Sequence, residues 1–177
     1  MPRPYAAVLV GVFCASVVGS AAVAQDLGGQ SRRPIERGPV DVAQLTDGAD
    51  LIVRGSVTSK QARWIGGAIY TQYDVTVQET LKGAPRNRVL VAVIGGTIGN
   101  VALSVPGAPE FALGRELVVF GVPLDNNGAT FTPLATFDGI VPITADNRRS
   151  TRTVSPRGIA EDLEAFLRQV RTLSRRP

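Results

Sequence analysis

Few side chains in this sequence could carry out covalent chemistry. Histidine is absent, and the single cysteine, Cys14, lies close to the N-terminus. A Ser-His catalytic triad cannot form without histidine, and the chain after Cys14 has no thiol for nucleophilic attack or for a thiolate zinc site. Carboxylates, hydroxyls and two lysines, Lys60 and Lys82, remain.

Carboxylates can hydrolyse a glycosidic bond when two of them converge at roughly 5–10 Å. The candidate acids are Asp74, Glu79, Glu110, Glu116 and Asp138. Their spacing singles out no pair, and Asp74 with Glu116 is the couple whose convergence would indicate an enzyme. The sequence therefore favours a protein that is not an enzyme, with no catalytic residue, no cofactor and no metal site. A carboxylate-based hydrolase acting on cell-envelope glycans is the alternative.

Two loops resemble ligand-binding motifs only in composition. The segment Gly95-Gly96-Thr97-Ile98-Gly99 follows a predicted strand as phosphate loops do, but no helix start and no Lys-Ser/Thr pair comes after it. The segment Asp125-Asn126-Asn127-Gly128 shares residue types with calcium loops, yet it lacks the spaced ligands and the later glutamate. We interpret the first as a loop and the second as a hairpin turn, because Asn and Gly tolerate positive φ.

Three aromatic residues, Trp64, Tyr70 and Phe111, could form an exposed surface for a peptide or a glycan. Aromatic residues near strand ends also pack commonly into cores. The sequence leaves both interpretations open, and these three residues are its candidate binding surface.

Residues 1–24 have the three parts of a secretory signal. Arg3 is the only charge, an uncharged run extends from Tyr5 through Val18, and Ala22-Val23-Ala24 is typical of a cleavage site. The apolar run is short for a permanent span, which needs about 20 apolar residues. We expect cleavage before Gln25 and a periplasmic or secreted protein that contacts a membrane only through an uncleaved leader.

The composition favours an all-β domain that ends in a helix. Of the 177 residues, 44% are hydrophobic and 19% are charged, and glycine and proline are abundant. The formal net charge of +4 comes almost wholly from arginine, and we expect no nucleic-acid partner. Residues 25–39 are poor in apolar side chains and predict a flexible linker, residues 40–145 the β domain, and residues 146–177 a linker and the C-terminal helix.

Hydrophobic periodicity predicts the elements of that domain. A short helix is expected over 41–48, strands over 51–57, 69–78, 88–94, 101–105, 116–122, 129–134 and 138–143, and a final helix that Ser155 caps and Pro156 begins. Residues 116–122 are apolar on both faces, so this strand should be central and buried. The predicted core comprises Leu51, Val53, Val75, Val77, Val91, Leu117 and Val119, with the helix docked through Leu163 and Phe166.

Four segments carry a resemblance to known proteins. They are Ala49-Asp50-Leu51-Ile52-Val53-Arg54-Gly55-Ser56-Val57, Tyr73-Asp74-Val75-Thr76-Val77-Gln78-Glu79-Thr80-Leu81-Lys82-Gly83, Gly107-Ala108-Pro109-Glu110-Phe111 and Gly114-Arg115-Glu116-Leu117-Val118-Val119-Phe120. Their order resembles uncharacterised exported bacterial proteins and the netrin-type module of tissue inhibitors of metalloproteases. The resemblance covers about residues 49–120 and implies an OB-like Greek-key barrel of about five to seven strands with a helix packed on it.

The same resemblance does not transfer the inhibitory mechanism. Those inhibitors chelate the target's zinc through an N-terminal cysteine, and no cysteine follows the leader in this chain. We therefore expect an exported binding or accessory domain of unknown ligand, whose partner is another exported protein.

Overall fold

The computed structural model describes residues 41–135, 137–146, 151–155 and 160–175. The predicted leader and the predicted linker over 25–39 lie outside the described residues. In the part of the chain that is described, no helix is long and apolar enough to cross a membrane.

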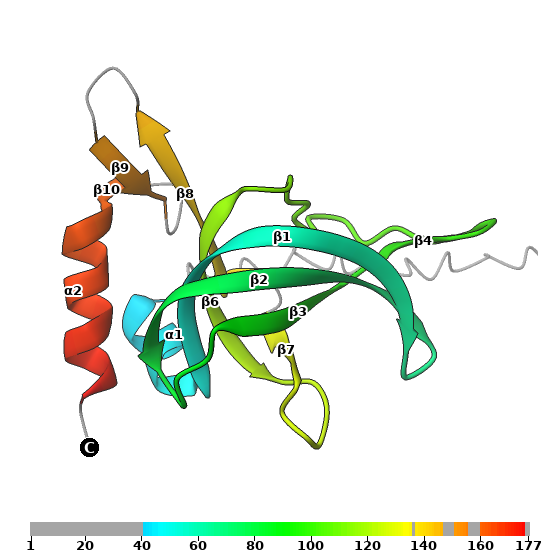
Figure 1. Ribbon diagram of the computed structural model, residues 1–177, viewed down its shortest axis with the longest axis horizontal. Coiled ribbons are helices and arrows are strands. Elements are labelled where there is room, and N and C mark those ends of the chain that lie inside the picture. Colours follow the sequence, from blue (N-terminus) through cyan, green and yellow to red (C-terminus); the bar gives the residue numbers. More distant parts are fainter. Residues whose placement is uncertain (1–40, 136, 147–150, 156–159, 176–177) are drawn as a thin grey trace, which may run out of the picture. The chain divides into compact units, whose positions relative to one another are not determined.

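The described chain is mostly β, with a short helix before the strands and a longer one after them (Figure 1). The elements are α1 (Val42–Gly48), β1 (Leu51–Ile65), β2 (Ala68–Lys82), β3 (Arg88–Ile94), β4 (Gly96–Ile98), β5 (Val101–Leu103), β6 (Glu116–Pro123), β7 (Thr130–Pro133), β8 (Ile140–Asp146), β9 (Thr151–Val154), β10 (Glu161–Asp162) and α2 (Leu163–Ser174). Nine of these elements overlap an element of the same type that the sequence predicts. The other three are β4, which lies in a predicted loop, and β9 and β10, which the sequence does not predict as strands.

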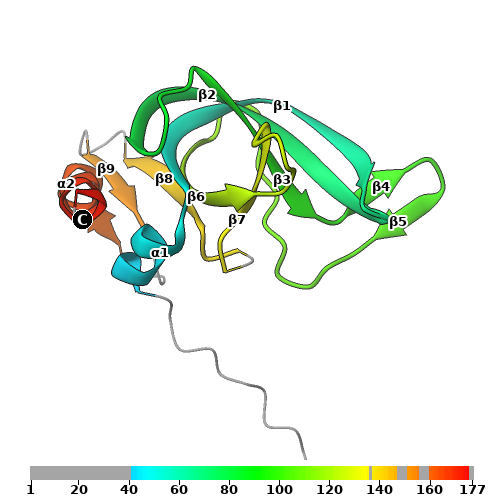
Figure 2. The ribbon, with the colours of Figure 1, turned by 90° about the horizontal axis from the view of Figure 1, so that it is seen from below.

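Eight strands form one mixed sheet in the order β1-β2-β3-β7-β6-β8-β9-β10, and β4 and β5 pair separately. The pairing of β3 with β7 is parallel and the others are antiparallel. β1 also pairs with β6 through residues 51–56, so the pairings from β1 through β2, β3, β7 and β6 return to β1. Figure 2 shows the long, curved β1–β2 hairpin reaching beyond the other strands towards β4 and β5.

Two groups of buried side chains hold this arrangement together. The sheet core comprises Leu51, Val53, Val57, Tyr73, Val75, Val89, Val91, Val93, Phe111, Leu117, Val119, Phe131 and Ile140. The helix core comprises Val42, Leu45, Ala49, Ile52, Val118, Phe120, Val141, Ile143, Val154, Leu163, Phe166, Leu167, Val170 and Leu173. The predicted core residues all belong to the sheet core, with Val77 at its margin, and the predicted helix contacts belong to the helix core.

The strand β6 contributes to both cores, which explains why it is apolar from Leu117 onward. Leu117 and Val119 point into the sheet core, whereas Val118 and Phe120 point into the helix core. Successive side chains of a strand alternate between faces, so a strand buried on both faces must be apolar throughout. The prediction of a central, buried strand over 116–122 is confirmed.

The C-terminal helix begins later than its sequence predicts. The pattern of Ser155 and Pro156 predicts a helix start, but β10 pairs with β9 and α2 begins at Leu163. Asp162 is the N-cap, and its carboxylate accepts a hydrogen bond from Ala165 N at 3.0 Å. The predicted linker after residue 145 therefore contains part of β8 and the strands β9 and β10, while Pro156 and Ile159 lie outside the described residues.

Candidate functional site

The three candidate aromatic residues do not form one surface. Phe111 is 5% exposed and packs edge-on against Tyr73 in the sheet core, with 5.3 Å between the ring centroids. Trp64 is 54% exposed and lies opposite Ile69, whereas Tyr70 lies opposite Arg63. Because adjacent positions on a strand face opposite sides, Trp64 and Tyr70 lie on different faces of the β1–β2 hairpin. The hypothesis that all three aromatic residues share one exposed surface is therefore wrong.

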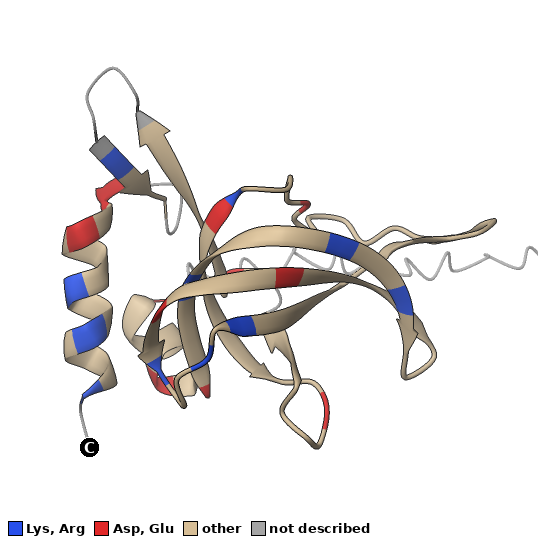
Figure 3. Cartoon of the chain, in the orientation of Figure 1, with Lys and Arg blue, Asp and Glu red and all other residues tan. Residues whose placement is uncertain are grey.

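Four of the five candidate acids are neutralised by a basic side chain. Asp74 is paired with Arg88, Glu79 with Arg171, Glu110 with Lys60, and Glu116 with Arg54 and Arg152. Asp138 lies in an exposed turn before β8. Positive and negative residues are interspersed over the described elements (Figure 3).

Glu116 is the most enclosed of these acids after Asp74, and it lies between two guanidinium groups. Its Oε1 accepts hydrogen bonds from Arg54 Nε at 3.1 Å and Arg54 Nη2 at 3.0 Å, and its Oε2 contacts Arg152. Burial and the nearby charge of Arg54 lower the pKa of Arg152, and the carboxylate of Glu164 opposes that shift. A carboxylate held between two cations is stabilised in its ionised form, so this arrangement suits an ion-pair network better than a general acid.

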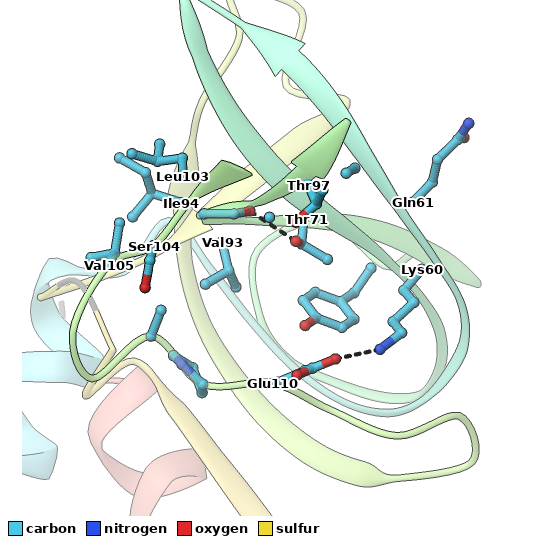
Figure 4. Close-up of a pocket in the computed structure, with 16 residues that line it drawn as sticks. Lys60, Gln61, Thr71, Val93, Ile94, Thr97, Leu103, Ser104, Val105 and Glu110 are labelled. Atoms are coloured by element: carbon cyan, nitrogen blue, oxygen red, sulfur yellow. Dashed lines mark hydrogen bonds and ion pairs between the residues drawn. The ribbon is translucent and has the colours of Figure 1, made fainter. Parts of the chain in front are cut away.

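A cavity of about 470 Å³ lies beside the part of the β1–β2 hairpin that extends past β6. Its lining comes from β1, β2, β3, β4, β5 and the connection before β6, and it comprises Lys60, Gln61, Ala62, Thr71, Tyr73, Val93, Ile94, Gly95, Gly96, Thr97, Leu103, Ser104, Val105, Ala108, Pro109 and Glu110. Figure 4 shows Lys60 and Glu110 reaching towards each other across one side of this space. The volume is in the range of ordinary ligand pockets.

The two charges at the cavity neutralise each other. Lys60 Nζ lies 2.5 Å from Glu110 Oε1, and the two side chains are 42% and 76% exposed. The hydrogen bond and the charge of Glu110 raise the pKa of Lys60, and the same contact lowers the pKa of Glu110. Both groups are therefore ionised at neutral pH, and the pair closes part of the cavity mouth without leaving a net charge.

Tyr73 lines the cavity and carries a buried hydroxyl. The side chain lies in the sheet core at 2% exposure, and its oxygen accepts a hydrogen bond from Phe111 N at 3.4 Å. The pKa of Tyr73 is raised, mainly by burial and further by the negative charge of Glu110. The hydrogen bond from Phe111 N–H and the positive charge of Lys60 oppose this shift. Since none of the described residues accepts the hydroxyl hydrogen, Tyr73 can donate it to a ligand.

Two glycines allow β4 to lie close above the β1–β2 hairpin at the cavity. Gly95 and Gly96 have φ of 113° and 136°, and a Cβ on Gly96 would lie 2.6 Å from Thr71 Oγ1. Thr71 Oγ1 itself donates to Gly95 O at 2.8 Å. The prediction that the whole segment 95–99 is a loop is wrong, because Gly96–Ile98 form β4 and pair with β5.

Sequence reasoning missed this site because its members are far apart in the chain. Lys60 and Glu110 are 50 positions apart, and Tyr73 lies between them in a strand whose alternation predicts only burial. No local motif links the three residues. Among the described residues, no three potential metal ligands lie close enough to hold an ion. No protein-family model matches the chain, and a search of curated proteins also finds no match.

The Lys60–Glu110 pair should contribute to stability only between acid and strongly basic pH. The lowered pKa of Glu110 means that its contribution is present above the usual value of 4.5 and is lost as the pH falls through the lower folded value. Because the pKa of Lys60 is raised, its contribution to stability is fully present below the usual pKa of 10.5. That contribution is lost as the pH rises through the higher pKa of the folded state. Thermal unfolding of Lys60→Met against wild type should show the largest deficit near neutral pH and a smaller one below about pH 4.

The control for that measurement is Lys60→Met made in a protein that already carries Glu110→Gln, compared with Glu110→Gln alone. With the carboxylate replaced, removing Lys60 should cause a change in stability that does not vary with acid pH. An equal pH dependence in both backgrounds would mean that Lys60 and Glu110 are not coupled in solution.

Proposed function

We propose that this chain is an exported, non-catalytic binding or accessory domain whose partner is another exported protein. The observation that carries the proposal is the pairing of Asp74, Glu79, Glu110 and Glu116 with basic side chains. A glycoside hydrolase needs one acid held protonated and a second carboxylate facing it. Asp74 and Glu116 are the two acids whose convergence would have indicated an enzyme. Each of them is instead hydrogen-bonded to its own arginine.

We further propose that the large sheet is an OB-like Greek-key barrel of the netrin type. The cycle of pairings through β1, β2, β3, β7 and β6 supports it, as does the parallel pairing of β3 with β7. The interior of such a barrel would be the sheet core, and α2 would cover the outer face of β1 and β6. A fold of this kind carries binding sites of many sorts, so the ligand must be argued from the site itself.

Export rests on the predicted signal over residues 1–24. Mass spectrometry of the protein recovered from the cell envelope or the medium should find an N-terminus at or near Gln25. An intact Met1 on protein confined to the cytosol would contradict it.

Affinity capture tests the binding function. The purified domain, immobilised, should retain a specific protein from the envelope and secreted fractions of the source cell, in a saturable manner. The matched control bait is Tyr73→Phe, which removes one hydroxyl from the cavity lining and keeps the aromatic ring in the sheet core. Recovery of the same proteins by the bait and by an unrelated immobilised protein would count against a binding function.

A further inference from the structure

We propose that the outer edge of β1 from Thr58 to Ile65 takes up an extended peptide segment of the partner, which adds to the sheet as a strand and places one uncharged side chain in the adjacent cavity. This inference rests on the proposed binding function and names the site and the chemistry of the partner.

The edge is open because β1 extends beyond the end of its pairing with β6. β1 pairs with β2 up to Ile65, whereas β6 pairs with it only as far as Ser56. Val57 still exchanges backbone hydrogen bonds with Arg115 and Gly114. From Thr58 onward, no strand among the described residues pairs with this side of β1, and most side chains there are exposed.

The hairpin geometry identifies which backbone groups are free at this edge. Ile65 and Ala68 close a two-residue turn at Gly66 and Gly67, whose φ of 57° and 84° are typical of a type I′ turn. The closing pair of such a turn is hydrogen-bonded, and hydrogen-bonded pairs alternate along an antiparallel ladder. Lys60, Ala62 and Trp64 therefore direct their N–H and C=O groups away from β2, as an added strand requires.

The cavity lies beside the same edge, because residues of that part of β1 line it. Lys60, Gln61 and Ala62 line it from β1, and Glu110 reaches Lys60 from the connection before β6 (Figure 4). A strand added to β1 would point every second side chain towards this space. The Tyr73 hydroxyl can donate to a polar atom there, and the walls formed by Val93, Val105 and Ala108 are apolar.

The charges on the edge favour an acidic partner segment. Among the described residues, Arg63 is hydrogen-bonded to Gln61 at 2.9 Å and to no carboxylate. Lys60 is already neutralised by Glu110, so the mouth of the cavity offers no free charge. A segment with an acidic residue facing Arg63 and an uncharged residue facing the cavity complements both features.

Backbone pairing can be tested by removing one outward N–H group. A library of random peptides displayed on phage is selected on the purified protein, and enriched peptides are measured against Lys60→Pro and Lys60→Met. Both variants lose the charge, but only proline lacks the N–H group, and proline is tolerated on a strand edge that faces solvent. We expect Lys60→Pro to bind about tenfold more weakly than Lys60→Met. Equal binding by the two variants, or a selection that enriches no peptide, would overturn the proposal.

Amide hydrogen exchange of the wild-type protein gives a result that does not depend on how the proline variant folds. The amides of Lys60, Ala62 and Trp64 should exchange quickly in the free protein and become protected when an enriched peptide is added, while Gln61 and Arg63 stay protected throughout. Protection of the first three amides without peptide would overturn the proposal. An exported partner captured equally by wild type and Lys60→Pro would leave the binding function standing and reject this edge as its site.

Discussion

Replacing Phe166 by alanine is expected to reduce the free energy of unfolding by about 3–5 kcal/mol. The Phe166 side chain is fully buried in the helix core and packs edge-on against Phe120, with 6.4 Å between the ring centroids. The neighbours in that core come from α1, β1, β6 and β8, which cannot all collapse into the space that a phenyl ring leaves. Urea unfolding of the purified variant measures the loss.

The matched control for Phe166→Ala is Gln169→Ala, on the exposed side of the same helix. This change should alter the free energy of unfolding by no more than about 0.5 kcal/mol. If Phe166→Ala were as stable as wild type, α2 would not be docked on β1 and β6 in solution.

Gly55→Ala is expected to destabilise the protein by about 3 kcal/mol, a large effect for the addition of one methyl group. A Cβ at Gly55 would lie 2.4 Å from Thr76 O and 2.7 Å from Val75 Cγ1. Gly55 is held between β2 and β6, opposite Val77 and Leu117, so the strand cannot move aside to relieve the contact. The reduced entropy of the unfolded chain offsets only about 0.4–1 kcal/mol of this cost.

Gly66→Asn provides the comparison for Gly55→Ala. Gly66 has a φ of 57°, a Cβ added there would meet nothing within 4 Å, and asparagine is a favoured residue in type I′ turns. Its stability should stay within about 0.5 kcal/mol of wild type. Similar stabilities for Gly55→Ala and wild type would mean that β1 and β2 do not approach each other as closely as the structure places them.

The sequence predicted the parts of the fold whose periodicity reflects burial. β6 is apolar from Leu117 onward because it separates two cores, and β2 alternates because one of its faces is wet. A glycine inside a strand is typical of a bulge or a bend, and the β1–β2 register shifts between Arg54 and Gly55. These features follow from local spacing and backbone conformation, which a single sequence carries.

The parts that sequence missed depend on contacts between distant segments. The outer half of β1 is polar and exposed, so periodicity predicts its end near Val57, yet pairing with β2 continues it to Ile65. Ser155 and Pro156 form a good local helix start, but the pairing of β10 with β9 and the cap at Asp162 place the helix elsewhere. The sequence places Phe111 in a loop, where an aromatic side chain could be exposed, but its backbone and its ring both contact Tyr73 in the core.

The candidate site was predicted least well, for the same reason. Its cavity requires Lys60, Tyr73 and Glu110 to meet, and neither composition nor spacing brings those three residues together. Of the predicted binding residues, Trp64 alone combines wide exposure with a position on the open edge of β1.

Incubation of the purified domain with peptidoglycan and with model glycosides tests the central claim of non-catalytic binding most directly. Mass spectrometry of the glycans, compared with a blank, should find their masses unchanged, because Asp74 and Glu116 are each engaged with arginine. Release of glycan fragments that Glu116→Gln or Asp74→Asn abolishes, in a variant that remains folded, would contradict the account and establish a carboxylate hydrolase.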